Sequence, residues 1–146
     1  MTTLAVDQPR SFEAGPDPVY NDMPVIASDI IYSGAAVGNA GTGSGLDGYA
    51  RPLVGGDEFE GFAEGKADNS SGAAGAVKVK LKQRGVVKLS VTGVTGATDK
   101  NSTVYATDDN TFTLTASGAS AIGKVVRYIS GTTVMVAFEA VGLRSI

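Results

Sequence analysis

One stretch of the chain, residues 77–91, alternates apolar and polar side chains with a period of two. A strand with one buried and one solvated face has this pattern, whereas a helix needs apolar residues three or four apart. Arg84-Gly85 interrupts the stretch, and we interpret it as a hairpin turn or a bulge. The apolar positions are Val77, Val79, Leu81, Val87, Leu89 and Val91. This segment therefore predicts a sheet that covers a core on one side.

Similar patterns recur toward the C-terminus. Two β-branched and aromatic runs flank the turn-forming triplet Asp108-Asp109-Asn110, and two more flank Ser130-Gly131. No helical period of any length lies between these runs. We therefore predict an all-β fold, a small antiparallel β-barrel or sandwich. The expected strands are 103–107, 111–115, 124–129 and 132–138.

The barrel or sandwich domain is expected to span residues 28–146. One strand or a strand pair is predicted over 28–37, and a short β region over 49–64. Between them lies a glycine-rich loop at 38–48. Its G-x-G-x-G pattern is similar to a phosphate-binding loop. However, the loop lacks the Lys-Ser/Thr ending and the following amphipathic helix that such a site needs. We interpret it as a surface loop.

The first 27 residues contain four of the five prolines and show no sustained period. Proline removes an amide donor and favours extended geometry in the preceding residue, so residues 1–27 are predicted to form an extended arm. The segment is either a disordered terminus or an arm that packs onto a neighbouring subunit or partner. We favour the packed arm because a free tail would leave its apolar residues in water. The candidate contact residues are Leu4, Val6, Phe12, Val19 and Tyr20.

The chain has 146 residues, room for one domain with an ordinary core, and it contains no His, Cys or Trp. Without His and Cys it lacks the commonest general base, the thiolate nucleophile and the usual zinc ligands. Asp108-Asp109-Asn110 lacks the alternating spacing of a calcium loop, so we predict a turn there and no metal or cofactor site. A carboxylate-only enzyme, using Asp57 and Glu58, remains the alternative to a non-enzymatic protein.

Charge is unevenly distributed along the chain, whose net charge is −3. Residues 1–73 carry eleven acids and three bases, whereas residues 74–146 carry four acids and nine bases. This asymmetry suits contacts between copies or with a partner. The lysines that alternate with Val and Leu lack interleaved aromatics or arginine forks, so we predict no direct nucleic-acid binding. We also expect no secretory signal and no membrane span, and therefore synthesis in a cytoplasm.

Two segments resemble small head-decoration (cement) proteins of tailed bacteriophages. Residues 55–91 have a G-D turn, an F-x-G-F strand, a D-N loop and a lysine-alternating strand in the order of that family. Residues 103–140 resemble its usual ending, with a V-Y-A-x-D-D-N turn and an I-G-x-V strand. The resemblance covers roughly the last two-thirds of the chain and lies in order and spacing.

The resemblance implies a protein on the outer surface of the virion that binds the major capsid protein of the assembled head. It also implies a homo-oligomer, with a trimer favoured and a dimer possible, that stabilises contacts between capsid subunits. From the sequence we expect the arm to donate a strand to the shell. The alternative from another class is a fibre or a receptor- or glycan-binding module. Such sites usually use exposed aromatics, and this chain has five Tyr, five Phe and no Trp.

Overall fold

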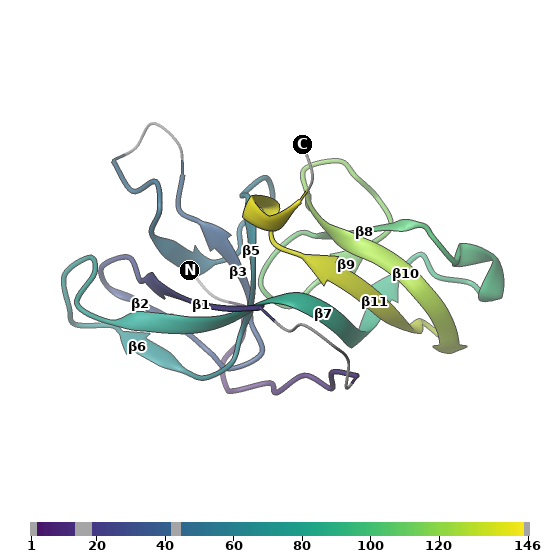
Figure 1. Cartoon of the computed structure of the whole chain (residues 1–146), viewed down its shortest axis with the longest axis horizontal. Coiled ribbons are helices and arrows are strands. Elements are labelled where there is room, and N and C mark those ends of the chain that lie inside the picture. Colours follow the sequence, from purple (N-terminus) through teal and green to yellow (C-terminus); the bar gives the residue numbers. More distant parts are fainter. Residues whose placement is uncertain (1–2, 14–18, 42–44, 145–146) are drawn as a thin grey trace.

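The computed structural model describes residues 3–13, 19–41 and 45–144. Within these ranges the chain is all-β, as predicted, with two short 3-10 helices, η1 (Ala97–Asp99) and η2 (Val141–Leu143). Figure 1 shows β8 to β11 gathered at one end, β1, β2 and β6 at the other, and β7 running between the two. The strands are β1 (Val19–Pro24), β2 (Asp29–Ile31), β3 (Ala36–Asn39), β4 (Ala50–Pro52), β5 (Phe59–Ala63), β6 (Ala67–Asn69), β7 (Lys78–Thr92), β8 (Thr103–Ala106), β9 (Phe112–Thr113), β10 (Ser120–Ser130) and β11 (Thr133–Glu139).

Five strands close into a barrel, which confirms the predicted architecture. Their order around the ring is β7, β11, β10, β8 and β9, and β9 returns to β7. All pairs are antiparallel except β7–β9. The hairpins predicted around Asp108-Asp109-Asn110 and Ser130-Gly131 are confirmed as β8–β9 and β10–β11. Closure of the ring leaves these five strands with few unpaired edges.

The other end of the molecule curls back on itself with fewer pairings. The first half of β7 pairs with β1 and with β5, and the sheet continues through β3 to β4. A single parallel bridge between Val25 and Ala50 joins the residue after β1 to β4, at the far side of the same sheet. The separate β2–β6 ribbon adds Ile31 and Ala67 to the core at this end.

Strands β3 and β5 form a wall between two cores. Ala36 and Phe62 belong to the barrel core, whereas the next residues, Val37 and Ala63, belong to the second core. Both strands therefore bury side chains on both faces, which explains why neither alternates apolar and polar residues regularly. The predicted pair over 28–37 appears as β2 and β3, which pair with different partners.

A β-bulge in β5 directs two phenylalanines into the same core. Val37 pairs with Gly61 and Gly38 pairs with Phe59, so one extra residue lies between them on β5. Phe59 and Phe62 consequently both face the barrel, where their ring centroids lie 5.5 Å apart. Gly61 has φ +129°, and a Cβ atom there would lie 2.5 Å from the Lys82 carbonyl oxygen. Only glycine fits this position without strain.

The hairpin turn expected at Arg84-Gly85 is wrong, because β7 runs unbroken through both residues. Gly85 pairs with Phe138 of β11, and a Cβ atom at position 85 would lie in van der Waals contact with the Phe138 ring, at 3.4 Å. A bulge does occur close by, since the register against β1 skips Gln83. The inward positions of β7 remain odd-numbered throughout, from Val79 to Val91. One strand thus lines both cores.

Candidate docking face

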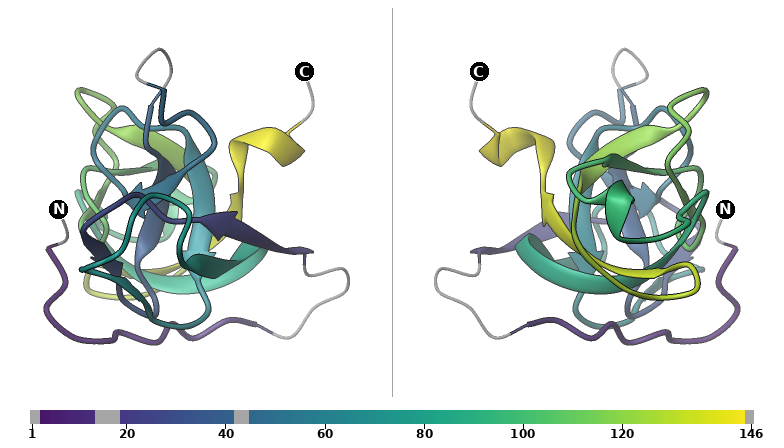
Figure 2. Two further views of the ribbon diagram at one scale, coloured as in Figure 1. Left: turned by 90° about the vertical axis from the view of Figure 1, so that its left-hand side faces the viewer. Right: turned by 90° about the vertical axis from the view of Figure 1, so that its right-hand side faces the viewer.

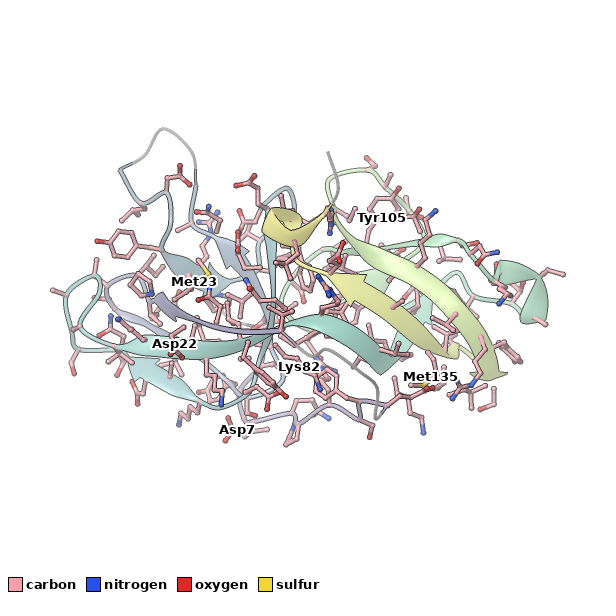
Figure 3. All side chains as sticks on the ribbon, in the orientation of Figure 1. Asp7, Asp22, Met23, Lys82, Tyr105 and Met135 are labelled. Carbon is pink, nitrogen blue, oxygen red and sulfur yellow. The ribbon has the colours of Figure 1, made fainter. Side chains whose placement is uncertain are left out.

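The β1–β7 pair carries the most distinctive surface of the described residues. Tyr20 lies opposite Lys82, and Asp22 lies opposite Lys80. Because directly opposed residues of an antiparallel pair share a face, these side chains gather on the outer side of the sheet. Figure 3 shows Asp22 and Lys82 on this strand pair. We call Tyr20 together with Lys78, Lys80 and Lys82 the lysine–tyrosine face.

Tyr20 is 46% exposed and lies among the lysine ammonium groups. The Lys80 Nζ atom is 5.1 Å from the ring centroid, and the Lys82 Nζ atom is 6.0 Å from it. Both distances are within the range of a cation–π interaction. Sequence reasoning placed Tyr20 on a separate arm and found no aromatic among the lysines. Pairing of β1 with β7, which the sequence pattern did not reveal, brings them together.

The lysine–tyrosine face is positively charged on a chain that is negative overall. None of its three lysines forms an ion pair with any residue that the structure describes. Arg84, the next base along β7, differs because its Nε atom lies 3.1 Å from Glu139 Oε2. Asp22 is the acidic residue of β1 on this side of the sheet. The face therefore has an excess of unneutralised positive charge.

The five predicted contact residues fall into two groups. Leu4 and Phe12 pack into the chain's own cores: Leu4 is 7% exposed in the second core, and Phe12 lies against the barrel core. Phe12 also forms a β-bridge with Val87. Val6 is 66% exposed, Val19 is half-buried and Tyr20 is exposed. Of this set, Val6 and Tyr20 offer substantial surface to a partner.

Residues 3–13 run along one side of their own chain (Figures 1 and 2). The Thr3 amide donates to Asp109 Oδ1 at 3.0 Å, and the Gln8 amide donates to the Ser33 carbonyl at 2.7 Å. The Arg10 Nε atom donates to the Gly34 carbonyl at 2.7 Å. These bonds hold the segment at three points along its length.

Arg10 packs against two aromatic rings of the barrel core. Its guanidinium lies 5.4 Å from the Phe112 ring centroid and 5.9 Å from that of Phe62. Burial lowers the pKa of Arg10, and the nearby Asp109 carboxylate opposes that shift. The guanidinium also donates to Asn110 Oδ1 at 2.8 Å. The turn triplet of β8–β9 is thus a binding partner for the N-terminal segment.

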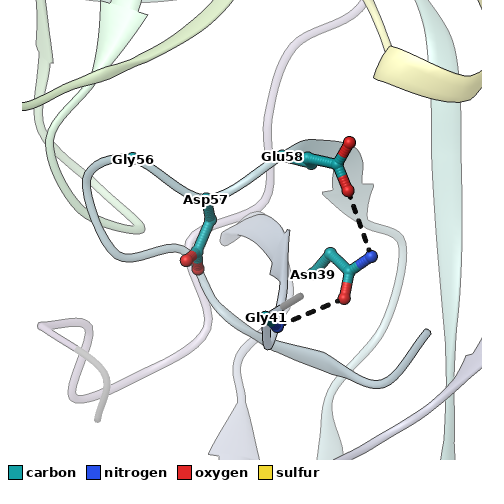
Figure 4. Close-up of a pocket in the computed structure, with 5 residues that line it drawn as sticks. All are labelled: Asn39, Gly41, Gly56, Asp57 and Glu58. Carbon is teal, nitrogen blue, oxygen red and sulfur yellow. Dashed lines mark hydrogen bonds between the residues drawn. The ribbon is translucent and has the colours of Figure 1, made fainter. Parts of the chain in front are cut away.

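A small pocket of about 160 Å³ lies beside the β4–β5 loop (Figure 4). It is lined by Asn39, Gly41, Gly56, Asp57 and Glu58. Asn39 donates to Glu58 Oε1 at 3.3 Å and accepts from the Gly41 amide at 3.3 Å. The asparagine side chain therefore ties the two loops around the pocket to each other.

The two carboxylates of the enzyme alternative have structural partners at this pocket. Asp57 forms a two-pronged ion pair with Arg51, with N–O distances of 2.7 and 2.9 Å, and also accepts from the Val54 amide. Glu58 is bound to Asn39. Burial, together with the charges of Glu58 and Asp47, raises the pKa of the neighbouring Glu60. These contacts hold the β4–β5 loop in place and bring several carboxylates close together.

The triplet Asp108-Asp109-Asn110 forms a tight turn, as predicted. Asp108 Oδ1 accepts from the Asn110 amide at 2.8 Å, which is the bonding pattern of an Asx-turn. In the part of the chain that the structure describes, no three acidic residues are grouped so as to hold a metal ion. Of the glycine-rich loop predicted at 38–48, Gly38 and Asn39 belong to strand β3. Residues 42–44 of this loop lie outside the described ranges.

Comparisons with known proteins give no match to a family model, to a curated protein or to a solved structure. Among the described residues, no helix has the length and apolar character needed to cross a bilayer. The candidate site therefore stands on its own geometry: a cationic face with one exposed tyrosine, carried by the strand that both cores share.

Proposed function

We propose that this chain is a decoration protein, which binds the outer surface of an assembled bacteriophage head and stabilises contacts between major capsid proteins. The observation that supports this proposal is where the resembling motifs lie in the fold. The F-x-G-F motif is the bulged strand β5, and the lysine-alternating motif is β7. The D-D-N motif is the β8–β9 turn that holds the N-terminal segment. The motifs are thus the residues that build the fold.

The architecture suits a clamp that acts by binding. A closed barrel and a second core share one long strand, so the covalent backbone of β7 joins the two ends directly. Binding in several copies, as a trimer or a dimer, would multiply weak single contacts into firm attachment. No catalytic step is needed for this role.

Cosedimentation with heads tests the proposal. Heads of the phage that encodes the chain, prepared without it, are mixed with increasing amounts of the purified protein and pelleted. We expect saturation at a fixed ratio to the major capsid protein, and a higher temperature for release of packaged DNA. Failure to pellet with heads would overturn the proposal. Binding to host cells in place of heads would favour the fibre or receptor-binding alternative.

A further inference from the structure

We propose that the lysine–tyrosine face is a docking surface for an acidic protein surface, and that it provides the chain's main attachment to the shell. The inference rests on the proposed function for the identity of the partner. It moves the contact from residues 3–13 to β1 and β7, and it keeps Tyr20 from the five predicted contact residues. Leu4 and Phe12, two of the apolar residues expected to reach a partner, are already packed within the chain.

The lysines are arranged as a regular row. Lys78, Lys80 and Lys82 occupy alternate positions of one strand, so their Cα atoms are about 6.6–6.8 Å apart. Carboxylates on alternate residues of a strand in the partner would match this spacing. Complementary charges of this kind increase the rate of encounter and select the partner.

The backbone beneath the row is rigid. Strand β7 pairs with β1 and then β11 along one edge, and with β5 and then β9 along the other. The inward residues Val79 and Leu81 are almost fully buried in the second core. The positions of the lysine Cα atoms are therefore fixed before binding, and only side-chain freedom is lost on docking.

The outer edge of β1 is poorly suited to strand addition. Pro24 has no amide hydrogen, and the Asp22 amide already donates to Asn21 Oδ1 at 2.9 Å. Features of this kind protect sheet edges from pairing with other chains. A partner would consequently contact the outer face of the β1–β7 pair and would not extend its sheet.

Three features favour a protein partner with carboxylates over a nucleic acid. The unpaired cations are lysines, and Arg84 is already bound to Glu139. Asp22 lies opposite Lys80, where a continuous phosphate backbone would meet a negative charge. The Tyr20 ring already lies within cation–π distance of two ammonium groups, which would compete with a base for the ring.

The test compares two variants with the same change in charge. One replaces the row (Lys78→Gln, Lys80→Gln, Lys82→Gln), and the control replaces three lysines elsewhere (Lys66→Gln, Lys100→Gln, Lys124→Gln). Each is checked for folding by circular dichroism. At about 50 mM salt we expect the row variant to bind heads about tenfold more weakly, and the control within about twofold of the wild type. Binding by the wild type should weaken as salt rises, and binding by the row variant should change less.

The outcomes separate the docking inference from the proposed function. Equal binding by the row variant and the wild type, or an equal loss in both variants, would overturn the inference while the function stands. If the wild type does not bind heads, the proposed function is overturned. The docking inference is then tested by measuring binding of the wild type and both variants to poly-L-glutamate. A loss of poly-L-glutamate binding confined to the row variant then supports the inference, and its absence overturns it. Tighter binding to a dT oligonucleotide than to poly-L-glutamate, dependent on the same lysines, would overturn the choice of an acidic protein.

Discussion

The two ends of the molecule bury their cores by different means. The barrel end closes through backbone pairing around a full ring, and its core contains the phenylalanines Phe59, Phe62, Phe112 and Phe138. The second end closes through the single bridge between Val25 and Ala50, and its fully buried residues are aliphatic side chains, alanines and one methionine. The barrel sheet thus closes through backbone pairing, whereas the sheet at the second end relies on side chains where its backbone ladder is incomplete.

Asn69 supplies what the second end lacks in backbone pairing. Its side-chain amide donates to the Ile26 carbonyl at 2.8 Å and to the Ala73 carbonyl at 3.0 Å, with a longer contact to the Val25 carbonyl at 3.4 Å. The residue is almost fully buried. One side chain therefore connects the loop after β1 with the loop after β6, where strands do not meet.

Removing an aromatic ring from the barrel should cause the largest loss of stability. The Phe62 centroid lies 4.9 Å from that of Phe138 and 5.5 Å from that of Phe59. We expect Phe62→Ala to lower the free energy of unfolding by about 3–5 kcal/mol, because it removes buried apolar area and leaves a cavity. Denaturant unfolding followed by circular dichroism measures this, with Phe62→Leu as a milder control. A loss below about 1 kcal/mol would show that the aromatic cluster does not dominate the barrel.

A substitution at Gly61 tests whether the wall between the two ends depends on the close approach of β5 to β7. We expect Gly61→Ala to cost about 2–4 kcal/mol, since it adds a left-handed backbone penalty to a clash with the Lys82 carbonyl. Gly131→Ala is the matched control, because Gly131 also has positive φ but a Cβ atom there would meet open space. It should cost about 1–2 kcal/mol. Similar losses in the two variants would mean that the close approach at Gly61 is unimportant.

The role of Asn69 at the second end predicts a local effect. We expect Asn69→Ala to cost about 1–3 kcal/mol, because it leaves buried carbonyls without donors. Hydrogen exchange should accelerate at residues 25–31 and 67–73 and remain unchanged in β10 and β11. Asn69→Asp, which keeps the size of the side chain and replaces the donating amide with an oxygen, should be at least as damaging. A uniform acceleration over the whole chain would show that the two ends unfold as one unit.

The smallest effect is expected at Glu60, in strand β5 of the wall. Burial and the charges of Glu58 and Asp47 raise its pKa in the folded state. The fold therefore binds this proton more tightly than the unfolded chain does, and the associated stability is present in acid and lost as the pH rises through the folded-state pKa. Glu60→Gln should raise the melting temperature slightly at pH 7 and leave it nearly unchanged near pH 4. A larger gain at pH 4 would contradict this sign.

Sequence patterns predicted the barrel end well and the second end poorly. The β8–β9 and β10–β11 hairpins follow from local turn residues and β-branched runs, so neighbours in sequence are neighbours in space. The second end depends on contacts between distant segments, such as β1 with β7 and Asn69 with Ile26. Local patterns carry no information about such pairings.

The candidate site shows the same limit. The lysine row was visible in the sequence, but the tyrosine beside it was assigned to an arm. The sequence did not show that Tyr20 lies on a strand that pairs with the lysine row. The four prolines of the first 27 residues obscure the short pattern of this strand, β1. Phe12 was predicted to contact a neighbouring subunit or partner, whereas the structure packs it against the chain's own barrel core.

The sequence alone determined the class of fold and the period of β7, because alternation of side chains and turn chemistry are local properties of the backbone. The sequence also indicated that β7 is continuous, because its buried positions are odd-numbered both before and after Gly85. Only the tertiary structure decided that one strand serves two cores, that β3 and β5 separate them, and that Tyr20 joins the lysines. These depend on which distant segments pack together, and packing is set by the shape and volume of the whole core.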